Sequence, residues 1–93
     1  MTTQCEWDPK KAELNLKKHG IRFEEACTVF DDPLFITFLD EEHSVEEPRY
    51  ITIGMSNQNR LLLIAHVDRG ERNRLISARK ATKSEREFYE AGL

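Results

Sequence analysis

The residues best suited to chemistry are cations that crowd together late in the chain. Arg72, Arg74, Arg79 and Lys80 lie within nine positions of one another, and Lys83 extends the run. An arginine guanidinium presents a planar fork that can bind two oxygens of a phosphate, which solubility alone does not require. The cluster therefore predicts a surface that binds an anion.

The charge of the whole chain is distributed unevenly. Positions 60–86 hold eight Lys and Arg against three Asp and Glu, whereas positions 24–47 hold nine acidic residues and no Lys or Arg. The formal net charge of −3 conceals this contrast. The asymmetry indicates one positive surface for a polyanion and a separate negative region. Mutual neutralisation of the two regions in the folded protein is the alternative.

Cleavage of an RNA strand without a metal is chemistry that such cations could support. The reaction needs a group that takes the 2′-hydroxyl proton, charge that offsets the phosphorane, and a proton donor for the leaving oxygen. Arg79 and Lys80 suit the charge stabilisation, and His19 is the preferred proton-transfer residue. His19 could instead be a helix-end residue that binds free carbonyls. His66 better fits a core or strand-edge position, and His43 lies in an acidic loop.

Other kinds of site leave little trace in the sequence. No CxxC, HxxxH, glycine-rich phosphate loop or nucleophile motif occurs, so we expect no metal and no cofactor. Cys5 and Cys27 are expected to be buried free thiols. The sequence shows no leader segment and no run of 18 apolar residues. Together with the expected free thiols, these features predict a protein of the reducing cytoplasm that does not associate with a membrane. Trp7 and Tyr89 stand beside charged residues and could stack on a base.

Three helices are predicted. Asp8 can cap a helix that opens on Pro9, and Gly20 can end it, which predicts a helix over Pro9–His19. Apolar residues at helical spacing predict a second helix over Phe23–Phe30. Thr82 and Glu85 form a capping-box pattern that opens a short C-terminal helix.

The middle of the chain changes to a period of two. Strands are predicted over Leu34–Leu39, Arg49–Met55, Arg60–Val67 and Arg72–Arg79. Short turns between them imply an antiparallel meander, to which Cys5-Glu6-Trp7 could add an edge strand. On the fourth strand, alternation predicts Arg72, Arg74, Ile76, Ala78 and Lys80 on one face and Asn73, Leu75, Ser77 and Arg79 on the other. The expected fold is one α+β domain over residues 1–93, with helices packed on a four-stranded antiparallel sheet.

Three segments taken together resemble a known family. They are Glu6-Trp7-Asp8-Pro9, Lys18-His19-Gly20 and Ile76-Ser77-Ala78-Arg79-Lys80-Ala81-Thr82. In this order they resemble the BrnT family, and the similarity covers about residues 5 to 90. The resemblance implies a RelE-like toxin fold and a ribonuclease that arrests translation. The polar residues that match the family's pattern are Lys18, His19, Arg79, Lys80, Glu85 and Tyr89, which are the candidate catalytic set.

The resemblance also implies partners. These are a BrnA-type antitoxin that neutralises the toxin, operator DNA reached only through the antitoxin, and a heterotetrameric complex. Arg72, Arg74, Lys83 and Trp7 are expected to bind the RNA substrate. Two functions remain open: a metal-independent endoribonuclease, and a catalytically weak module that binds the antitoxin and tunes operator binding. A housekeeping RNA-binding protein is a third reading.

Overall fold

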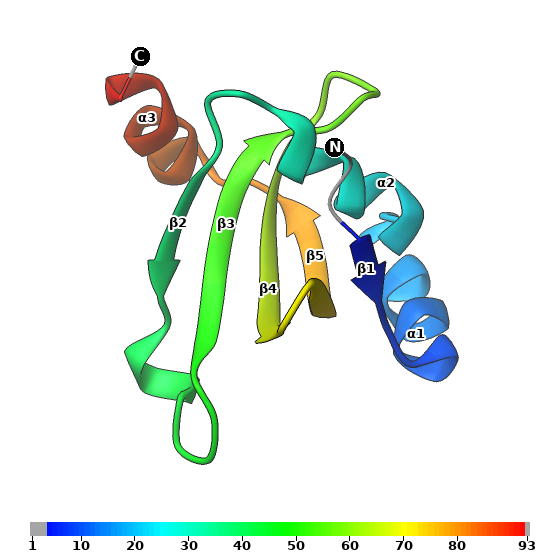
Figure 1. The fold of residues 1–93 in the computed structure, drawn as a ribbon. Coiled ribbons are helices and arrows are strands. Elements are labelled where there is room, and N and C mark those ends of the chain that lie inside the picture. The colour runs from blue at the N-terminus through cyan, green and yellow to red at the C-terminus, as the bar shows by residue number, and fades with distance from the viewer. Residues whose placement is uncertain (1–3, 93) are drawn as a thin grey trace.

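The computed structural model describes residues 4–92, which form three α-helices and a single sheet (Figure 1). The elements in chain order are β1 (Gln4–Glu6), α1 (Pro9–His19), α2 (Phe23–Cys27), the 3₁₀ turn η1 (Thr28–Asp31), β2 (Ile36–Leu39), the 3₁₀ turn η2 (Glu41–His43), β3 (Arg49–Met55), β4 (Leu61–Arg69), β5 (Arg72–Lys80) and α3 (Lys83–Ala91). In Figure 1, α1 and α2 lie beside β1 and β5, while α3 lies at the other side of the sheet, near β2 and β3.

The predicted bounds of α1 are confirmed. The Asp8 side chain accepts a hydrogen bond from the Lys10 amide, and Pro9 occupies the first turn. Gly20 ends the helix with a φ of 71°, a left-handed conformation that side chains other than glycine's disfavour.

The second helix is shorter than predicted. It stops at Cys27, and the chain tightens into η1. The Thr28 hydroxyl donates a 2.6 Å hydrogen bond to the Glu25 carbonyl and accepts one from the Asn57 amide. A side chain that binds nearby backbone in this way competes with regular helical hydrogen bonding, which accounts for the early end.

The sheet has five strands in the order β1-β5-β4-β3-β2, not four. β2, β3, β4 and β5 form the predicted antiparallel meander, and β1 adds a strand parallel to β5. The sheet is therefore mixed, and the prediction of a purely antiparallel sheet is wrong in this respect. Three residues are too few to show a period, so the sequence marks β1 only as a potential edge strand.

A β-bulge in β5 changes which side chains share a face. Ala65 pairs with Ser77, but the next residue, His66, pairs with Leu75, so Ile76 is the extra residue. Leu75 and Ala78 consequently enter the same hydrophobic core although they are three residues apart.

The bulge also corrects the predicted placement of the cations. Arg79 shares a face with Arg72 and Arg74, opposite to the prediction, and we call this the cationic face. Lys80 moves to the other side. Simple alternation fails here because an inserted residue shifts every later side chain to the opposite face.

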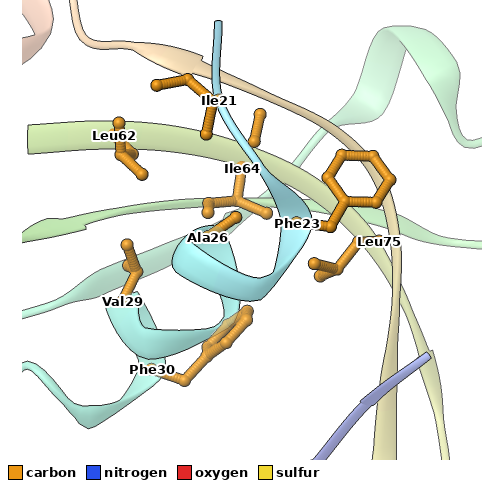
Figure 2. Close-up of a cluster of buried hydrophobic side chains, with 9 residues drawn as sticks. Ile21, Phe23, Ala26, Val29, Phe30, Leu62, Ile64 and Leu75 are labelled. Carbon is orange, nitrogen blue, oxygen red and sulfur yellow. The ribbon is translucent and has the colours of Figure 1, made fainter. Parts of the chain in front are cut away.

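The second side of the sheet, which we call the helix-covered face, carries the main core. Side chains from α2 and η1 pack on strands β4 and β5 there (Figure 2). The cluster consists of Ile21, Phe23, Ala26, Val29, Phe30, Leu62, Ile64, Leu75 and Ala78. A smaller cluster of Ile53, Leu61 and Tyr89 lies on the cationic face beneath α3. One sheet face is thus filled by helices, and the other is covered only where α3 crosses it.

The prediction of free thiols at Cys5 and Cys27 is wrong. The two form a disulfide that joins β1 to α2, with their Cα atoms 6.2 Å apart. The sequence separation of 22 gave no sign of this proximity, which arises because β1 pairs with β5 and α2 packs on the same strand. The inference of a reducing compartment loses the support of free thiols.

Within residues 4–92, no helix combines the length and apolar character that crossing a membrane requires.

Candidate functional site

Arg79 and Glu85 form the tightest ion pair on the cationic face. The guanidinium donates two hydrogen bonds to the carboxylate, from Nη1 to Oε1 at 2.8 Å and from Nη2 to Oε2 at 2.9 Å. Glu85 also accepts from the Thr82 amide and so completes the capping box of α3. The Arg79 guanidinium is the main cause that lowers the pKa of Glu85 to about 2. The start of α3 therefore fixes the orientation of this arginine.

Two further arginines of β5 occupy the same face. Arg74 donates a 3.1 Å hydrogen bond from Nη1 to Glu6 on β1, and both side chains remain about one-third exposed. Arg72 is exposed and forms no ion pair among the described residues. Arg49, which is partly exposed, lies in register with Val67 and through it with Arg74. The structure thus gathers arginines from β3 and β5 on one side of the sheet.

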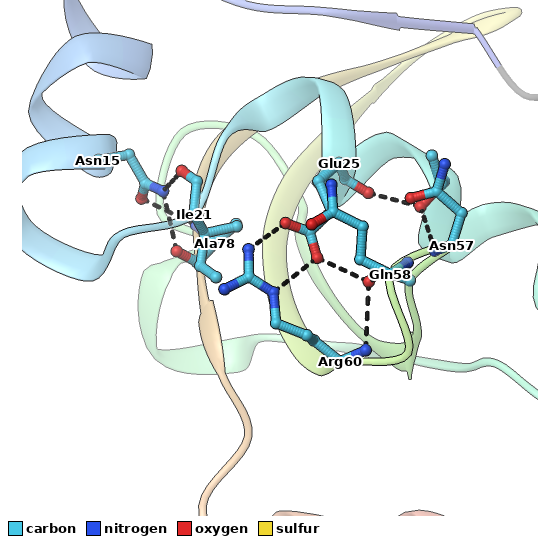
Figure 3. A network of polar contacts seen from close by, with 9 residues as sticks. Asn15, Ile21, Glu25, Asn57, Gln58, Arg60 and Ala78 are labelled. Carbon is cyan, nitrogen blue, oxygen red and sulfur yellow. Dashed lines mark hydrogen bonds and ion pairs between the residues drawn. The ribbon is translucent and has the colours of Figure 1, made fainter.

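Lys80 does not join this group. It lies on the helix-covered face, where its charge helps to lower the pKa of Glu25, although the hydrogen bond from Arg60 is the larger cause. Glu25 is buried and binds the Arg60 guanidinium (Figure 3). It also accepts a hydrogen bond from the Ser56 hydroxyl. This network ties α2 to the turn between β3 and β4. The Lys80 side chain therefore lies near a structural ion pair, on the opposite face of the sheet from the Arg79 side chain.

His19 and Lys18 lie beside the outer edge of β5. The C-terminal part of α1 and the bulged part of β5 line an open, shallow pocket of about 240 Å³. Its lining consists of Lys11, Leu14, Asn15, Lys18, His19, Ile76 and Ser77. Ser77 is two residues from Arg79 and points to the same face, so the pocket adjoins the cationic face. The pocket thus lies between a helix near the N-terminus and the last strand of the sheet.

Asn15 lies between α1 and β5 beside this pocket, and its role was not predicted from the sequence. Its amide donates to the carbonyls of Ile21 and Ala78, both at 2.9 Å, and its oxygen accepts from the Ala78 amide at 3.0 Å (Figure 3). The side chain thus pairs with β5 as a neighbouring strand would, beyond the end of β1. A polar residue within the Ala12, Leu16 and His19 stripe was the available signal.

Tyr89 is engaged in holding α3 to the sheet. It is only 6% exposed, and its hydroxyl donates a 2.6 Å hydrogen bond to Asp32. Asp32 also accepts from the amides of Leu34 and Met55. Burial, together with Asp32, raises the pKa of Tyr89 to about 12, so the phenol stays protonated and serves as a donor. Sequence reasoning also missed Asp32 as its partner.

The remaining candidates are scattered. The Trp7 ring packs edge-on against Phe23, with centroids 5.8 Å apart, so it contributes to the core. Lys83 is exposed at the start of α3. His66 is 4% exposed and bonded to Thr52 at 2.7 Å, which confirms the core reading, and burial lowers its pKa to about 4. His43 pairs with Asp40 in the exposed loop.

Within the part of the chain that the structure describes, no three His, Cys, Asp or Glu side chains gather as they would around a metal ion.

Comparison with known proteins defines the class of protein to which this fold and this cationic face belong. A family model described as "Ribonuclease toxin, BrnT, of type II toxin-antitoxin system" matches residues 7–85. The fold is similar to that of the Brucella abortus ribonuclease toxin BrnT, whose crystal structure was determined at 1.1 Å resolution. That likeness has a TM-score of 0.68 and 25% sequence identity, and covers 88% of this chain and 100% of the Brucella chain. A search of curated proteins finds no match.

The class is therefore that of ribonuclease toxins from type II toxin–antitoxin systems. The chain belongs to the BrnT family, since the family model covers most of its length.

Proposed function

We propose that this protein is an endoribonuclease that cleaves RNA without a metal ion, at the place where the pocket beside β5 meets the cationic face. One observation carries the proposal: the bulge at Ile76 puts Arg79 on the same face of the sheet as Ser77, and Ser77 lines the pocket beside Lys18 and His19. A phosphodiester bound over Ser77 would have cations on both sides.

His19 takes the proton-transfer role in this mechanism. An imidazole nitrogen can accept the 2′-hydroxyl proton as that oxygen attacks the phosphorus. The same ring, or the Lys18 ammonium beside it, can then protonate the departing 5′-oxygen. No other histidine among residues 4–92 suits this role, because His66 is buried and His43 lies in the acidic loop.

Arg79 supplies charge stabilisation, and Glu85 is its positioning residue. Of the five N–H donors of the Arg79 guanidinium, two bind the Glu85 carboxylate and one binds the Lys80 carbonyl. The remaining donors can bind a phosphate oxygen whose charge grows in the transition state. Lys80 and Tyr89 have no chemical step in this proposal, since the charge of Lys80 acts on Glu25 and the Tyr89 hydroxyl is hydrogen-bonded to Asp32.

Cleavage of a single-stranded RNA in excess EDTA tests the mechanism. We expect the wild type to cut and to leave a 2′,3′-cyclic phosphate, and His19→Gln to cut roughly 10²- to 10⁴-fold more slowly. Lys17→Ala is the matched control, because Lys17 is on the same helix but is 74% exposed and pairs with Glu13 instead of lining the pocket. Abolition of cutting by EDTA, or full activity of His19→Gln, would contradict the proposal.

One observation favours the alternative of a weakly catalytic binding module. Arg69, Arg74 and Arg79 each already have a carboxylate partner, which reduces the positive charge available to RNA. In either case we propose a BrnA-type antitoxin as the neutralising partner, a heterotetrameric complex, and operator DNA contacts through the antitoxin. Expression without the antitoxin separates the two: the nuclease arrests translation and growth, and the module does not.

A further inference from the structure

Two phenylalanine side chains are exposed together on the cationic face. Phe38 on β2 is 42% exposed and Phe88 on α3 is 58% exposed. Their rings meet edge to face, with centroids 6.0 Å apart and an interplanar angle of 88°. Trp7 and Tyr89, the aromatic residues predicted to stack on bases, instead pack in the protein core. The exposed Phe38–Phe88 pair has no such role in the core.

The pair lies at one end of a row that crosses the sheet. Phe38 is in register with Ile51, Ile51 with Ala65, and Ala65 with Ser77. Three strand spacings of roughly 4.8 Å separate the two ends, so the row is about 14 Å long. The intervening side chains, Ile51 and Ala65, are small or medium apolar groups and are partly exposed. The row therefore connects the exposed aromatic pair with the pocket that holds His19.

Cations border the row on both sides. One neighbouring row contains Arg79, in register with Leu63. The other contains Arg49 and Arg74, in register through Val67. Each neighbouring row is about 7 Å away, the distance that two residues cover along a strand. An apolar surface between rows of arginines suits a nucleic acid, because the faces of its bases stack on apolar groups and its backbone is anionic.

We propose that this row is a binding track for single-stranded RNA. An unpaired base stacks on the Phe38–Phe88 pair, and phosphates of the RNA backbone contact Arg49, Arg74 and Arg79. The inference rests on the proposed ribonuclease function and extends it to substrate class. Because a flat base must lie against the rings, duplex RNA, whose bases are already stacked and paired, cannot use the track. The bound base lies one or two nucleotides from the bond that is cut at Ser77.

An apolar segment of a protein partner is the other occupant that could cover the two rings. The flanking arginines favour RNA. Arg49 forms no ion pair among the described residues, and Arg74 and Arg79 keep guanidinium N–H groups beyond those bonded to Glu6 and Glu85. Phe35 provides the contrast: it is 40% exposed, but it packs edge-on against Phe30 on the helix-covered face.

Binding of a ten-nucleotide 2′-O-methyl oligoribonucleotide, labelled with fluorescein, tests the track. This probe lacks the 2′-hydroxyl and is not cut, so the catalytically intact protein can be used. We expect Phe38→Ala and Phe88→Ala each to raise the Kd for the single strand by about 5- to 100-fold. Phe38→Trp should restore binding, because a larger ring still offers a stacking surface.

The controls separate stacking from misfolding. Phe35→Ala removes an equally exposed ring from the opposite face and should bind the probe as the wild type does. The annealed duplex should bind every variant equally. With a cleavable RNA, Phe38→Ala should raise KM and leave kcat within about twofold.

Each contrary result has a defined meaning. Unchanged binding by both alanine variants, with wild-type cutting intact, would overturn the track and leave the ribonuclease proposal standing. Loss of antitoxin binding without loss of oligonucleotide binding would assign the rings to the protein partner and also overturn it. A wild type that neither binds nor cuts single-stranded RNA would overturn the ribonuclease proposal itself.

Discussion

Glu85 takes part in two interactions at once. Its carboxylate completes the capping box with Thr82 and at the same time holds the Arg79 guanidinium in a bidentate pair. The residue therefore couples the start of α3 to the orientation of a cation on β5. The positioning role that we propose for Glu85 rests on this coupling and does not require direct contact with RNA.

The pH dependence of stability tests this role. The pKa of Glu85 is lowered from 4.5 to about 2 in the folded protein, so its contribution to stability is complete above about pH 5 and is lost as the pH falls toward 2. We expect urea unfolding to show that Glu85→Gln is less stable than the wild type at pH 6, and that the difference shrinks by pH 2.5.

Glu13→Gln is the control for that measurement, because its pair with Lys17 is exposed on both sides. It should change the free energy of unfolding little at either pH. A constant gap between Glu85→Gln and the wild type from pH 6 to pH 2.5 would show that the Arg79 pair does not stabilise the fold.

At the scale of elements, β5 organises the site. Its bulge turns Arg79 to the face of Arg72 and Arg74, and its outer edge is paired by β1 at one end and by Asn15 at the other. Exposed backbone at a sheet edge invites pairing with other chains, so an asparagine that occupies this edge also protects it. The pocket beside His19 depends on this connection between α1 and β5.

Replacement of Asn15 tests the connection. Asn15→Ala leaves backbone groups of Ala78 and Ile21 without their partner, and we expect a loss of about 2 kcal/mol in the free energy of unfolding. Hydrogen exchange at the Ala78 amide should accelerate in the same variant. Leu14→Ala, one residue earlier and 64% exposed, should change stability by less than about 0.5 kcal/mol. Equal stability of both variants would remove Asn15 from its role at the strand edge.

At the scale of the whole molecule, the Cys5–Cys27 disulfide connects the N-terminal strand to the helical layer. Closing a loop with a sequence separation of 22 restricts the unfolded chain, and loop-entropy estimates give about 3 kcal/mol of stabilisation. We expect dithiothreitol to lower the denaturation midpoint of the wild type. The Cys5→Ser, Cys27→Ser double variant should have the lower midpoint with or without the reductant. A wild type whose midpoint does not respond to dithiothreitol would argue against the disulfide.

The sequence by itself determined the family and those elements whose starts and ends are marked by nearby residues. Pro9–His19 and the capping box of α3 were predictable because caps, prolines and helix-ending glycines act within a few residues. β3 was predicted to its exact bounds since its apolar period is regular.

Only the tertiary structure decided which side chains meet. A one-residue bulge at Ile76 leaves no mark on composition, yet it reversed the faces of Arg79 and Lys80. The parallel β1, the Cys5–Cys27 disulfide and the Phe38–Phe88 pair depend on contacts between residues far apart in the chain. Such contacts depend on strand register and layer packing, which nearest-neighbour preferences do not specify.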